Sequence, residues 1–289
     1  MEHSLQPHEE IKKRLSTSIE KMPSLPTTVG KVIQLANDIN SSAKDILTVI
    51  QMDPVLTAKV LKLIHSAFYG MSKKISLKQA IVLLGINTIK NLALSSAIVG
   101  QMHKSKVKIK TFDPYQYWEH CLATGIASRI ICKKLQTDPQ AVDEFFVAGL
   151  IHDIGKLVLA LGMPMIYAKT LHYAKKNSLN GVESELKIIG MDHAEVGSLL
   201  AQKWSLSEVL IDSILYHHEP EKKHGRLTWV VHVANYFTQK KGYVNAGEFG
   251  QPVLNPEVGG VLGLSEAEIE LSLTNLTEEI EKAAVFLQT

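Results

Sequence analysis

The sequence predicts an all-α fold in two helical lobes, and three observations support this prediction. Residues typical of helix N-termini recur along the chain, and apolar residues at helical spacing follow them. Glycine and proline gather in residues 241–263, which predicts a long loop. The lysine-rich segment 103–111 lies between two series of expected helices and is best explained as the solvated connection between the lobes.

The first lobe contains several expected helices. Asp53-Pro54 begins one of them, because aspartate caps a helix and proline suits its first position, and this helix should end near Gly70. Ser76-Leu-Lys-Gln79 has the pattern of a capping box and begins a helix that should break at Gly85. The next helix is expected to begin at Asn87 and to run toward Gly100.

The second lobe has similar signals. Asp113-Pro114 begins a long helix, and Asp192 caps a later one. Ser207 starts the helix that ends in Tyr216-His217-His218. Ser265-Glu-Ala-Glu268 is the capping box of a terminal helix. Further helices are expected over 140–160, 164–176, 181–189 and 226–239.

Charge and hydropathy exclude some classes of function. The 31 basic and 29 acidic residues give a formal net charge of +2, which argues against a nucleic-acid-binding surface. Two short helices within 77–98 superficially resemble a helix-turn-helix, but their exposed positions are not especially basic. The first ten residues are polar and acidic, so no secretory signal is expected, and charged residues interrupt the apolar region 145–166, so no membrane span is expected.

The two cysteines, Cys121 and Cys132, fall on one expected helix. Eleven residues of helical rise would separate them by about 16 Å. This distance is too long for a disulfide, so we expect a reduced, cytoplasmic protein.

Histidines that lie far apart in the sequence share one chemical logic. Neutral imidazoles together with one carboxylate suit a transition metal, so the sequence predicts one or two divalent ions of Fe, Zn, Ni or Mn. The predicted metal ligands are His120, His152, Asp153, His193, His217 and His218. Asp153 has two oxygens and could bridge two ions, with His120 and His152 on one ion and His193 with His217 or His218 on the other.

Asp153 and Lys156 are the predicted catalytic residues. A divalent ion lowers the pKa of bound water to about 7, and two ions about 3.5–4 Å apart can hold the attacking and leaving oxygens of a phosphoester. Lys156 lies one helical turn beyond Asp153 and could meet a phosphate. The pair His152-Asp153 lies in a strongly apolar stretch, so a bound ion or strong hydrogen bonds must satisfy it.

The other histidines are expected to be structural or exposed. His65, on an apolar helix, is expected to be hydrogen-bonded in the core, and His232 is expected near the ligands as a supporting residue. The histidines expected at the surface are His3, His8, His103, His172 and His224.

The motif His152-Asp153-Ile-Gly-Lys156, with the other histidines around it, resembles the HD superfamily of metal-dependent phosphohydrolases. The first lobe resembles the HDOD family, the HD-related output domain of bacterial signalling. The segments that carry this resemblance are Met22-Pro-Ser-Leu-Pro26, Asp53-Pro54, Ser66-Ala-Phe-Tyr69 and Ser76-Leu-Lys-Gln-Ala-Ile-Val-Leu-Leu-Gly85. The resemblance implies an N-terminal helical lobe over 17–110 and an HD-type helical bundle over 111–240, which leaves a loop and a C-terminal helix over 241–289.

The resemblance also implies that catalysis is an open question. Many HDOD proteins have lost metal ligands and act as regulatory or scaffolding modules, whereas this chain keeps most ligand-type residues and is in this respect similar to the HD-GYP cyclic-dinucleotide phosphodiesterases. It departs from those enzymes at two places. No Gly-Tyr-Pro loop follows His217-His218-Glu219, and Asn235 stands where HD enzymes place a late aspartate.

Two functions remain open at the level of the sequence. The favoured one is a bacterial signal-transduction module that acts by binding a protein or ligand, with a metal site retained and with signalling partners supplied in trans. The alternative is a metal-dependent phosphohydrolase that acts on a nucleotide or cyclic dinucleotide. A nucleotide or phosphate ligand is compatible with both functions, and neither requires a membrane.

Overall fold

The computed structural model describes residues 5–69, 75–103, 107, 109–136, 138, 141–223, 225–244 and 247–284. Within these residues every regular element is a helix and no strand occurs, which confirms the all-α prediction. The elements are α1 (Leu5–Lys21), α2 (Thr27–Asn37), α3 (Ala43–Gln51), α4 (Pro54–Ile64), α5 (Leu77–His103), α6 (Pro114–Lys134), α7 (Val142–Ile151), α8 (Ile154–Gly162), α9 (Pro164–Asn177), α10 (Gly181–Ile188), α11 (His193–Lys203), α12 (Glu208–Leu215), the 3₁₀ turn η2 (Pro220–Lys222), α13 (Arg226–Lys240), α14 (Val258–Leu262), α15 (Glu266–Ser272) and α16 (Leu276–Ala283).

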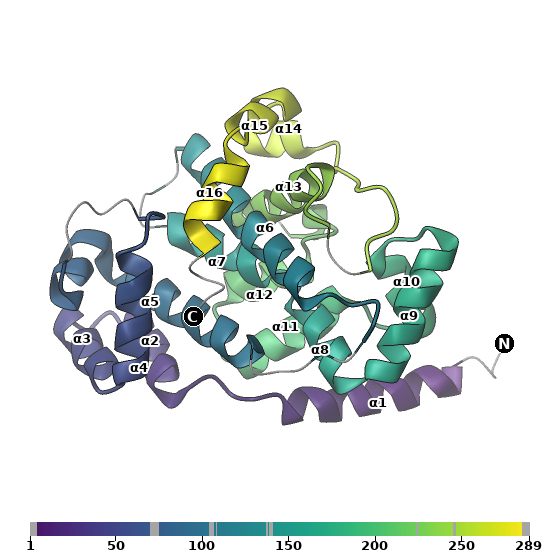
Figure 1. Cartoon of the computed structure of the whole chain (residues 1–289), viewed down its shortest axis with the longest axis horizontal. Helices are drawn as coiled ribbons and strands as arrows, with labels where there is room; N and C mark the ends of the chain where they lie inside the picture. Colours follow the sequence, from purple (N-terminus) through teal and green to yellow (C-terminus); the bar gives the residue numbers. More distant parts are fainter. Residues whose placement is uncertain are drawn as a thin grey trace.

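The helices α2 to α5 form a group at one end of the molecule (Figure 1), in which α2, α3 and α4 pack against α5. Asp53 caps α4 by accepting a hydrogen bond from the amide of Leu56 at 2.9 Å, as predicted. The capping box between Ser76 and Gln79 is also present, and the predicted break occurs at Gly85, where φ is 84°. The helix α4 ends at Ile64, earlier than the predicted end near residue 70, which lies outside the described residues.

A close approach of α6 and α7 forms the centre of the second group of helices. A Cβ atom at Gly149 would lie 2.6 Å from the carbonyl oxygen of Thr124 and 2.8 Å from the Cα of Gly125. Because real Cβ contacts are never this short, the two backbones can approach this closely only with glycine at this position. This approach brings the part of α6 that carries His120 beside the end of α7.

The chain turns at His152 and Asp153, between α7 and α8. The single helix predicted over 140–160 is therefore wrong, because apolar residues continue through both helices and conceal the break. The next helix turn packs tightly on the start of α11, where a Cβ at Gly155 would lie 2.7 Å from the amide nitrogen of Gly197 and closer still to the carbonyl of His193. The turn and this contact together place Asp153 beside His193.

The C-terminal region contains more helix than the sequence predicts. The predicted loop over 241–263 contains the short helix α14, so only residues 241–257 lack helix among those described. The predicted terminal helix is two helices, α15 and α16, and both pack on α6. The capping box between Ser265 and Glu268 is present at the start of α15.

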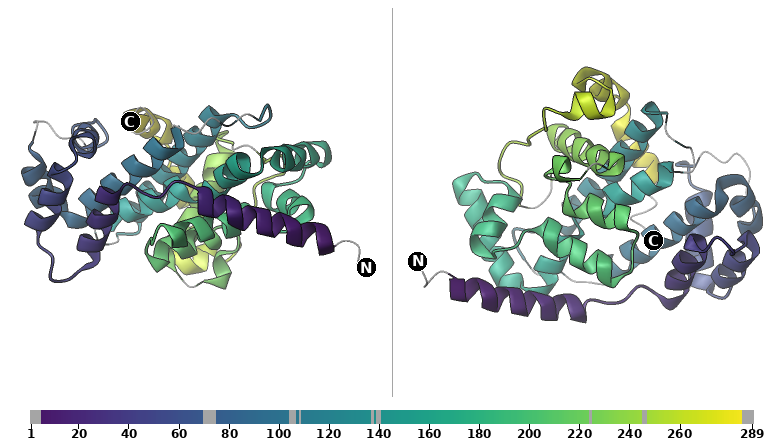
Figure 2. Two further views of the ribbon diagram at one scale, coloured as in Figure 1. Left: turned by 90° about the horizontal axis from the view of Figure 1, so that it is seen from below. Right: turned by 180° about the vertical axis from the view of Figure 1, so that it is seen from behind.

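The first helix, α1, lies along the second group of helices and packs on α8, and an extended segment then leads to α2 (Figure 2). Lys203 of α11 donates to the carbonyl oxygens of Ile19, Glu20 and Met22 at 2.6–2.9 Å, and the Trp204 indole donates to Pro23. The N-terminal segment therefore packs on the second group of helices and connects it to α2. The division at residues 110 and 240 remains a prediction.

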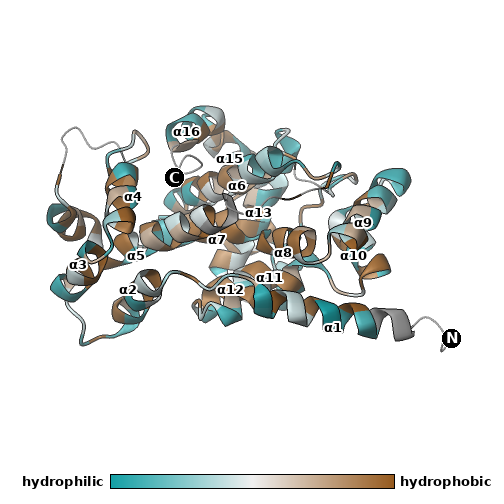
Figure 3. Ribbon diagram, turned by 60° about the horizontal axis from the view of Figure 1, so that its bottom comes forward, coloured by the Kyte–Doolittle hydropathy of each residue, from teal (hydrophilic) through white to brown (hydrophobic). Residues whose placement is uncertain are grey.

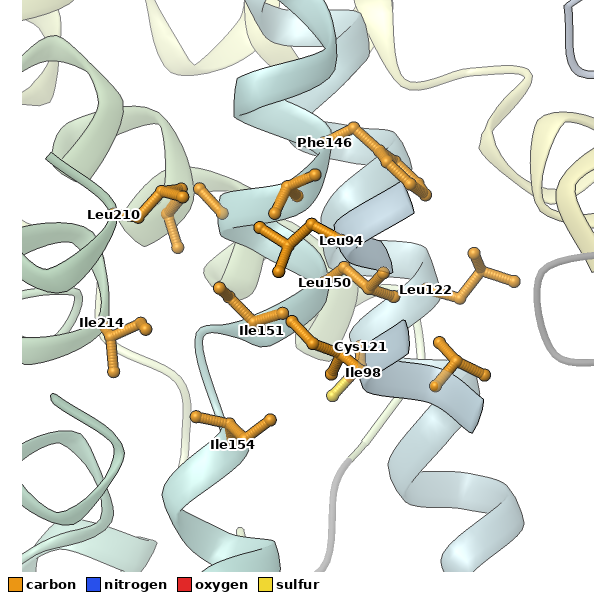
Figure 4. Packing of buried hydrophobic residues seen from close by; sticks show 14 of the residues in the cluster. Leu94, Ile98, Cys121, Leu122, Phe146, Leu150, Ile151, Ile154, Leu210 and Ile214 are labelled. Carbon is orange, nitrogen blue, oxygen red and sulfur yellow. The ribbon is translucent and has the colours of Figure 1, made fainter. Parts of the chain in front are cut away.

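Two segments, Leu77–Gly100 and Val142–Gly162, are long and apolar enough to cross a membrane, but 61% and 89% of their apolar windows are buried. The hydropathy colouring in Figure 3 shows that apolar residues dominate α7 and α8, near the middle of the molecule. Figure 4 shows Leu94 of α5 close to Leu150 of α7, within one apolar cluster. Packing in the core therefore accounts for both segments. Cys121 and Cys132 are buried and free, as expected.

Candidate metal centre

The six predicted metal ligands converge on one buried place, although four separate parts of the chain provide them. His120 comes from α6, the pair His152-Asp153 from the α7–α8 turn, His193 from the first residue of α11, and the last two histidines, 217 and 218, from the segment after α12. All are buried except His218, which is half-buried. Among the described residues they form two groups with Asp153 in common, and within each group the potential ligand atoms lie within 4.8 Å of one another.

The first group is a triangle of His120, His152 and Asp153. The two Nε2 atoms lie 3.3 Å apart, and Asp153 Oδ2 lies 3.6 Å from His120 Nε2 and 3.4 Å from His152 Nε2. A four- to six-coordinate ion with nitrogen ligands at about 2.0–2.1 Å separates neighbouring ligand atoms by about 3.0–3.4 Å. The triangle therefore has nearly the size of one face of such a coordination sphere.

The second group contains His193, His217 and His218 and uses the other oxygen of Asp153. His193 Nε2 lies 3.0 Å from Asp153 Oδ1 and 2.9 Å from His218 Nε2, while His217 Nε2 lies 3.6 Å from Asp153 Oδ1. Each carboxylate oxygen of Asp153 therefore faces one group. This is the arrangement that a bridging carboxylate would need.

Hydrogen bonds at Nδ1 fix the orientation of four of the imidazoles. Three of these nitrogens lie 2.7 Å from a backbone carbonyl oxygen, to which they can only donate: His120 to Tyr243, His152 to Gly149 and His217 to Ile214. The Nδ1 of His193 instead lies 2.6 Å from Glu185 Oε2. Donation at Nδ1 leaves a lone pair on Nε2 of each neutral ring, which is how metal-binding histidines are usually held.

The lone pairs of His120 and His152 point toward each other. Burial, partly opposed by Asp153, lowers the pKa of both rings, and that of His152 falls well below its ordinary range, so both are neutral. Neither neutral Nε2 can donate to the other across 3.3 Å, and the buried Nε2 of His217 has no hydrogen-bond partner among the described residues. Buried acceptors without donors are costly, so this donor set fits a bound cation.

The second group of histidines, which contains His193, His217 and His218, can hold a proton when no ion is bound. Burial by itself would lower the pKa of His193, but Glu185, together with Asp153, raises it to about 10 despite the opposing charge of Lys156. The resulting imidazolium can donate from Nε2 toward Asp153 or His218. A metal ion would have to displace this proton.

Lys156 is buried beside the centre. Its Nζ donates to Asp153 Oδ2 at 3.0 Å and to Glu248 Oε1 at 2.7 Å, and its side chain is 1% exposed. Burial opposes its charge, but Asp153 and Glu248 raise its pKa far above the ordinary value, so it is an ammonium ion. Asp153 and Glu248 thus accept hydrogen bonds from the same Nζ that the sequence predicts to bind a phosphate.

Comparison with known proteins identifies the family. The family model described as HDOD domain matches residues 22–220. The chain belongs to the HDOD family. An uncharacterised protein of Treponema pallidum is 25% identical over 205 residues, which is 71% of this HDOD chain and 39% of that protein. The chain thus spans well under half of that relative.

Solved structures share the fold. An HDOD domain protein of unknown function from Geobacter sulfurreducens superimposes with a TM-score of 0.76 at 23% identity, covering 95% of this chain and 98% of that one. A provisionally assigned phosphohydrolase from Shewanella amazonensis gives a TM-score of 0.72 at 24% identity, covering 94% and 98%. At these identities the likeness concerns the fold, so the ligand roles of the six residues in this HDOD chain remain predictions.

Sequence reasoning missed three residues of this HDOD centre. Glu185 accepts hydrogen bonds from both the backbone amide and the Nδ1 of His193, at 2.7 and 2.6 Å. Tyr243 contributes only its carbonyl, and Glu248 comes from the segment that was predicted simply as a loop. None belongs to a motif. The burial of Glu185, on a helix with a conventional capping box, leaves no sequence signal of its own.

The predictions for residues outside the ligand set agree only in part with the structure. His232 lies where it was expected, with its Nδ1 2.8 Å from the carbonyl oxygen of His217 and its Nε2 accepting from the amide of Asn255. Asn235 is buried, and its Oδ1 accepts from Gln239. His65 is hydrogen-bonded to the backbone of Ile75 as predicted, although it is half-buried and does not lie in the core.

Among the histidines expected at the surface, His172 is exposed. The remaining four fall outside the described side chains: His3, His8, His103 and His224.

A cavity of about 390 Å³ lies beside His218, a member of the second group of histidines. His218 and Glu248 line it together with residues of α10 and its N-cap, of α13, of the turn at 219–221 and of the segment 251–256. Among the described residues no lysine or arginine lines it, whereas four glutamates do: Glu183, Glu219, Glu221 and Glu248. The cavity is therefore negatively charged on the side from which a ligand would reach the histidines.

Proposed function

We propose that this HDOD chain is a signalling module that holds a divalent transition ion at the histidine centre and acts by binding a partner or ligand. The observation that carries the proposal is the pair of neutral, buried imidazoles whose Nε2 lone pairs face each other 3.3 Å apart beside Asp153. A purely structural polar cluster would place a donor between two such acceptors.

The charge balance supports at least one ion. The buried carboxylates Asp153, Glu185 and Glu248 contribute −3 and the ammonium of Lys156 contributes +1, so with neutral imidazoles the formal charge is −2. One divalent ion would bring this charge near zero, and two would leave it near +2. Uncompensated buried charge is costly, so we expect the first ion to bind more tightly than the second. Imidazole-rich ligation favours Fe, Zn, Ni or Cu over Mg.

Each residue has a defined part in this proposal. His120, His152 and Asp153 Oδ2 would hold one ion, and His193, His217, His218 and Asp153 Oδ1 would hold the other. Glu185, together with the carbonyls of Tyr243, Gly149 and Ile214, orients the rings. A bound divalent ion would supply a positive centre that attracts oxyanions and acidifies water.

Two observations favour binding over turnover. The ammonium of Lys156 is enclosed by Asp153 and Glu248, and no lysine or arginine among the described residues lines the adjacent cavity, so while Glu248 holds Lys156 neither residue type is free there to bind an anionic substrate. We therefore expect signalling partners supplied in trans, in the cytoplasm, with a phosphate or nucleotide ligand as a regulator. The test is turnover of a chromogenic phosphodiester by protein loaded separately with Fe, Zn, Ni and Mn. Absence of turnover with full metal content supports the binding role, and metal-dependent turnover that Asp153→Ala abolishes contradicts it.

One observation favours the alternative of a metal-dependent phosphohydrolase. The two oxygens of Asp153 each face one group of histidines, which is the geometry of a carboxylate that bridges two ions. In that case occupancy of both groups should be required for turnover. Titration of the protein with metal would then show activity only beyond one ion per chain.

A further inference from the structure

Glu248 is a carboxylate from outside the helical bundle that occupies a buried position beside the centre. Its Oε1 accepts from Lys156 Nζ at 2.7 Å, and its Oε2 accepts from the backbone amide of Gly181 at 3.2 Å. Its side chain is only 6% exposed, although it comes from the non-helical segment between α13 and α14. One buried ammonium and one amide at the start of α10 thus hold an anion that the chain itself supplies.

The donors around Glu248 are those that also bind phosphate. An ammonium forms strong charge-assisted hydrogen bonds with phosphate oxygens, and the first amides of a helix have no partner inside the helix. Lys156 also contacts Asp153 Oδ2, so its charge faces the metal centre on one side and Glu248 on the other. An external oxyanion could use these two donors only where Glu248 now lies.

The backbone conformation around Glu248 directs its side chain toward Lys156. Gly247 has φ of 95°, a conformation that side chains disfavour, and an added Cβ there would lie 3.0 Å from Leu171 Cδ2. The amide of Phe249 donates to the carbonyl of Leu179 at 3.3 Å, and Gly250 lies against the backbone of Asn180. The chain therefore turns Glu248 inward and passes over the start of α10.

The same segment also contacts the histidines and lines the cavity. The carbonyl of Tyr243 holds His120, the amide of Asn255 donates to His232, and Glu248 forms part of the cavity wall. Residues 247–257 are nevertheless not part of the helical bundle, since they form no helix and Val253 is 76% exposed. Displacing Glu248 would break few hydrogen bonds.

We propose that Glu248 is a built-in competitor: its carboxylate occupies the place of an external phosphate group at Lys156 and the Gly181 amide and keeps the centre closed until it is displaced. The ligand class is a phosphate or phosphoester oxyanion, which would take the place of one of the four carboxylates that line the 390 Å³ cavity. This inference does not require a metal ion, because both donors belong to the chain, and it can therefore fail or succeed independently of the proposed function.

Inorganic phosphate is the probe that tests the competition. Glu248→Gln keeps the size and the hydrogen-bonding oxygen but removes the charge, so metal-free Glu248→Gln should bind inorganic phosphate at least about ten-fold more tightly than the parent, the factor expected from releasing one charge-assisted hydrogen bond at Lys156. Glu257→Gln is the matched control, since it removes the same charge from an exposed position of the same segment. Its phosphate affinity should equal that of the parent. The double variant Lys156→Met/Glu248→Gln should lose the gain.

A second measurement keeps the proposal testable if Glu248→Gln does not fold. Hydrogen exchange of the parent protein should show faster exchange at the amides of Phe249 and Asn255 when inorganic phosphate is added, because phosphate would displace Glu248 and with it the hydrogen bonds of its neighbours. Equal phosphate affinity in Glu248→Gln and the parent, or exchange at these amides that phosphate leaves unchanged, would overturn the proposal.

Discussion

The side chains that the two groups of helices bury differ in their chemistry. In α2, α3 and α4 every buried residue is aliphatic, such as Val32, Ile46 and Leu63. The polar side chains buried in α5 are neutral: Thr88, Asn91, Ser95 and Ser96. The second group buries an ammonium, three carboxylates and several imidazoles at its centre, in addition to a large apolar core. Since burying a polar group costs free energy unless it is satisfied, an arrangement with this many polar groups is expected to stabilise the ligand-bound form more than the free form. The first group is thus expected to contribute stability, and the second to contribute the site.

The largest effect is expected at Asp153, on which both groups of histidines depend. Asp153→Ala removes the shared carboxylate and leaves the ammonium of Lys156 with one partner, so the metal-free protein should lose about 3–5 kcal/mol of unfolding free energy. Metal binding should be lost at both groups. Chemical denaturation and metal titration measure the two effects, and metal content equal to that of the parent would show that Asp153 is not a ligand.

A comparable loss of stability in the first group should leave metal binding intact. Leu63→Ala deletes a fully buried side chain of α4 and should lower the unfolding free energy by about 2–5 kcal/mol, because a cavity remains. Its affinity for metal, measured by competition with a chromogenic chelator, should match that of the parent. A large change in affinity would mean that the two groups of helices do not have separate roles.

A smaller effect is expected at Glu185, which holds His193 and touches no predicted ion. Glu185→Gln should weaken metal binding by about 10–100-fold, since carboxylates behind ligating histidines contribute about this much. The control is Glu195→Gln, which removes the same charge from an exposed position of α11. Because Glu195 belongs to the capping box of α11, the melting temperature of this variant has to be compared with that of the parent. Equal affinity in Glu185→Gln and the parent would argue against a role for Glu185 in holding His193.

The smallest effect is expected at His232, which supports the backbone of His217 and not its ring. His232→Gln can retain a hydrogen bond to the carbonyl oxygen of His217, so metal affinity should fall by less than about ten-fold. Isothermal titration calorimetry is suited to differences of this size. A loss as large as that of Asp153→Ala would place His232 among the ligands.

Much of the helical pattern could be predicted because its signals are local. Asp53, Ser76, Asp192 and Ser265 cap helices through hydrogen bonds to residues three positions away, and all four caps are present. The break at His152-Asp153 could not be predicted in the same way, because apolar residues continue across it. The turn is stabilised by packing against α11, a contact between distant parts of the chain.

The same distinction applies to the centre. The six candidate ligands were identifiable because imidazole and carboxylate carry recognisable chemistry, and the fold does bring them together. Tyr243 acts through a backbone carbonyl, which any residue possesses, and Glu248 reaches Lys156 across 92 positions of sequence. Such contacts depend on the tertiary structure, and nothing in the local sequence marks them.

Crystallographic anomalous scattering, recorded at the absorption edges of Fe, Zn, Ni and Mn, tests the central claim most directly. The account predicts at least one peak about 2.0–2.2 Å from an oxygen of Asp153 and from the Nε2 atoms of one histidine group. Protein that has been incubated with each ion and shows no peak beside Asp153, with His120 and His152 still facing each other, would contradict it.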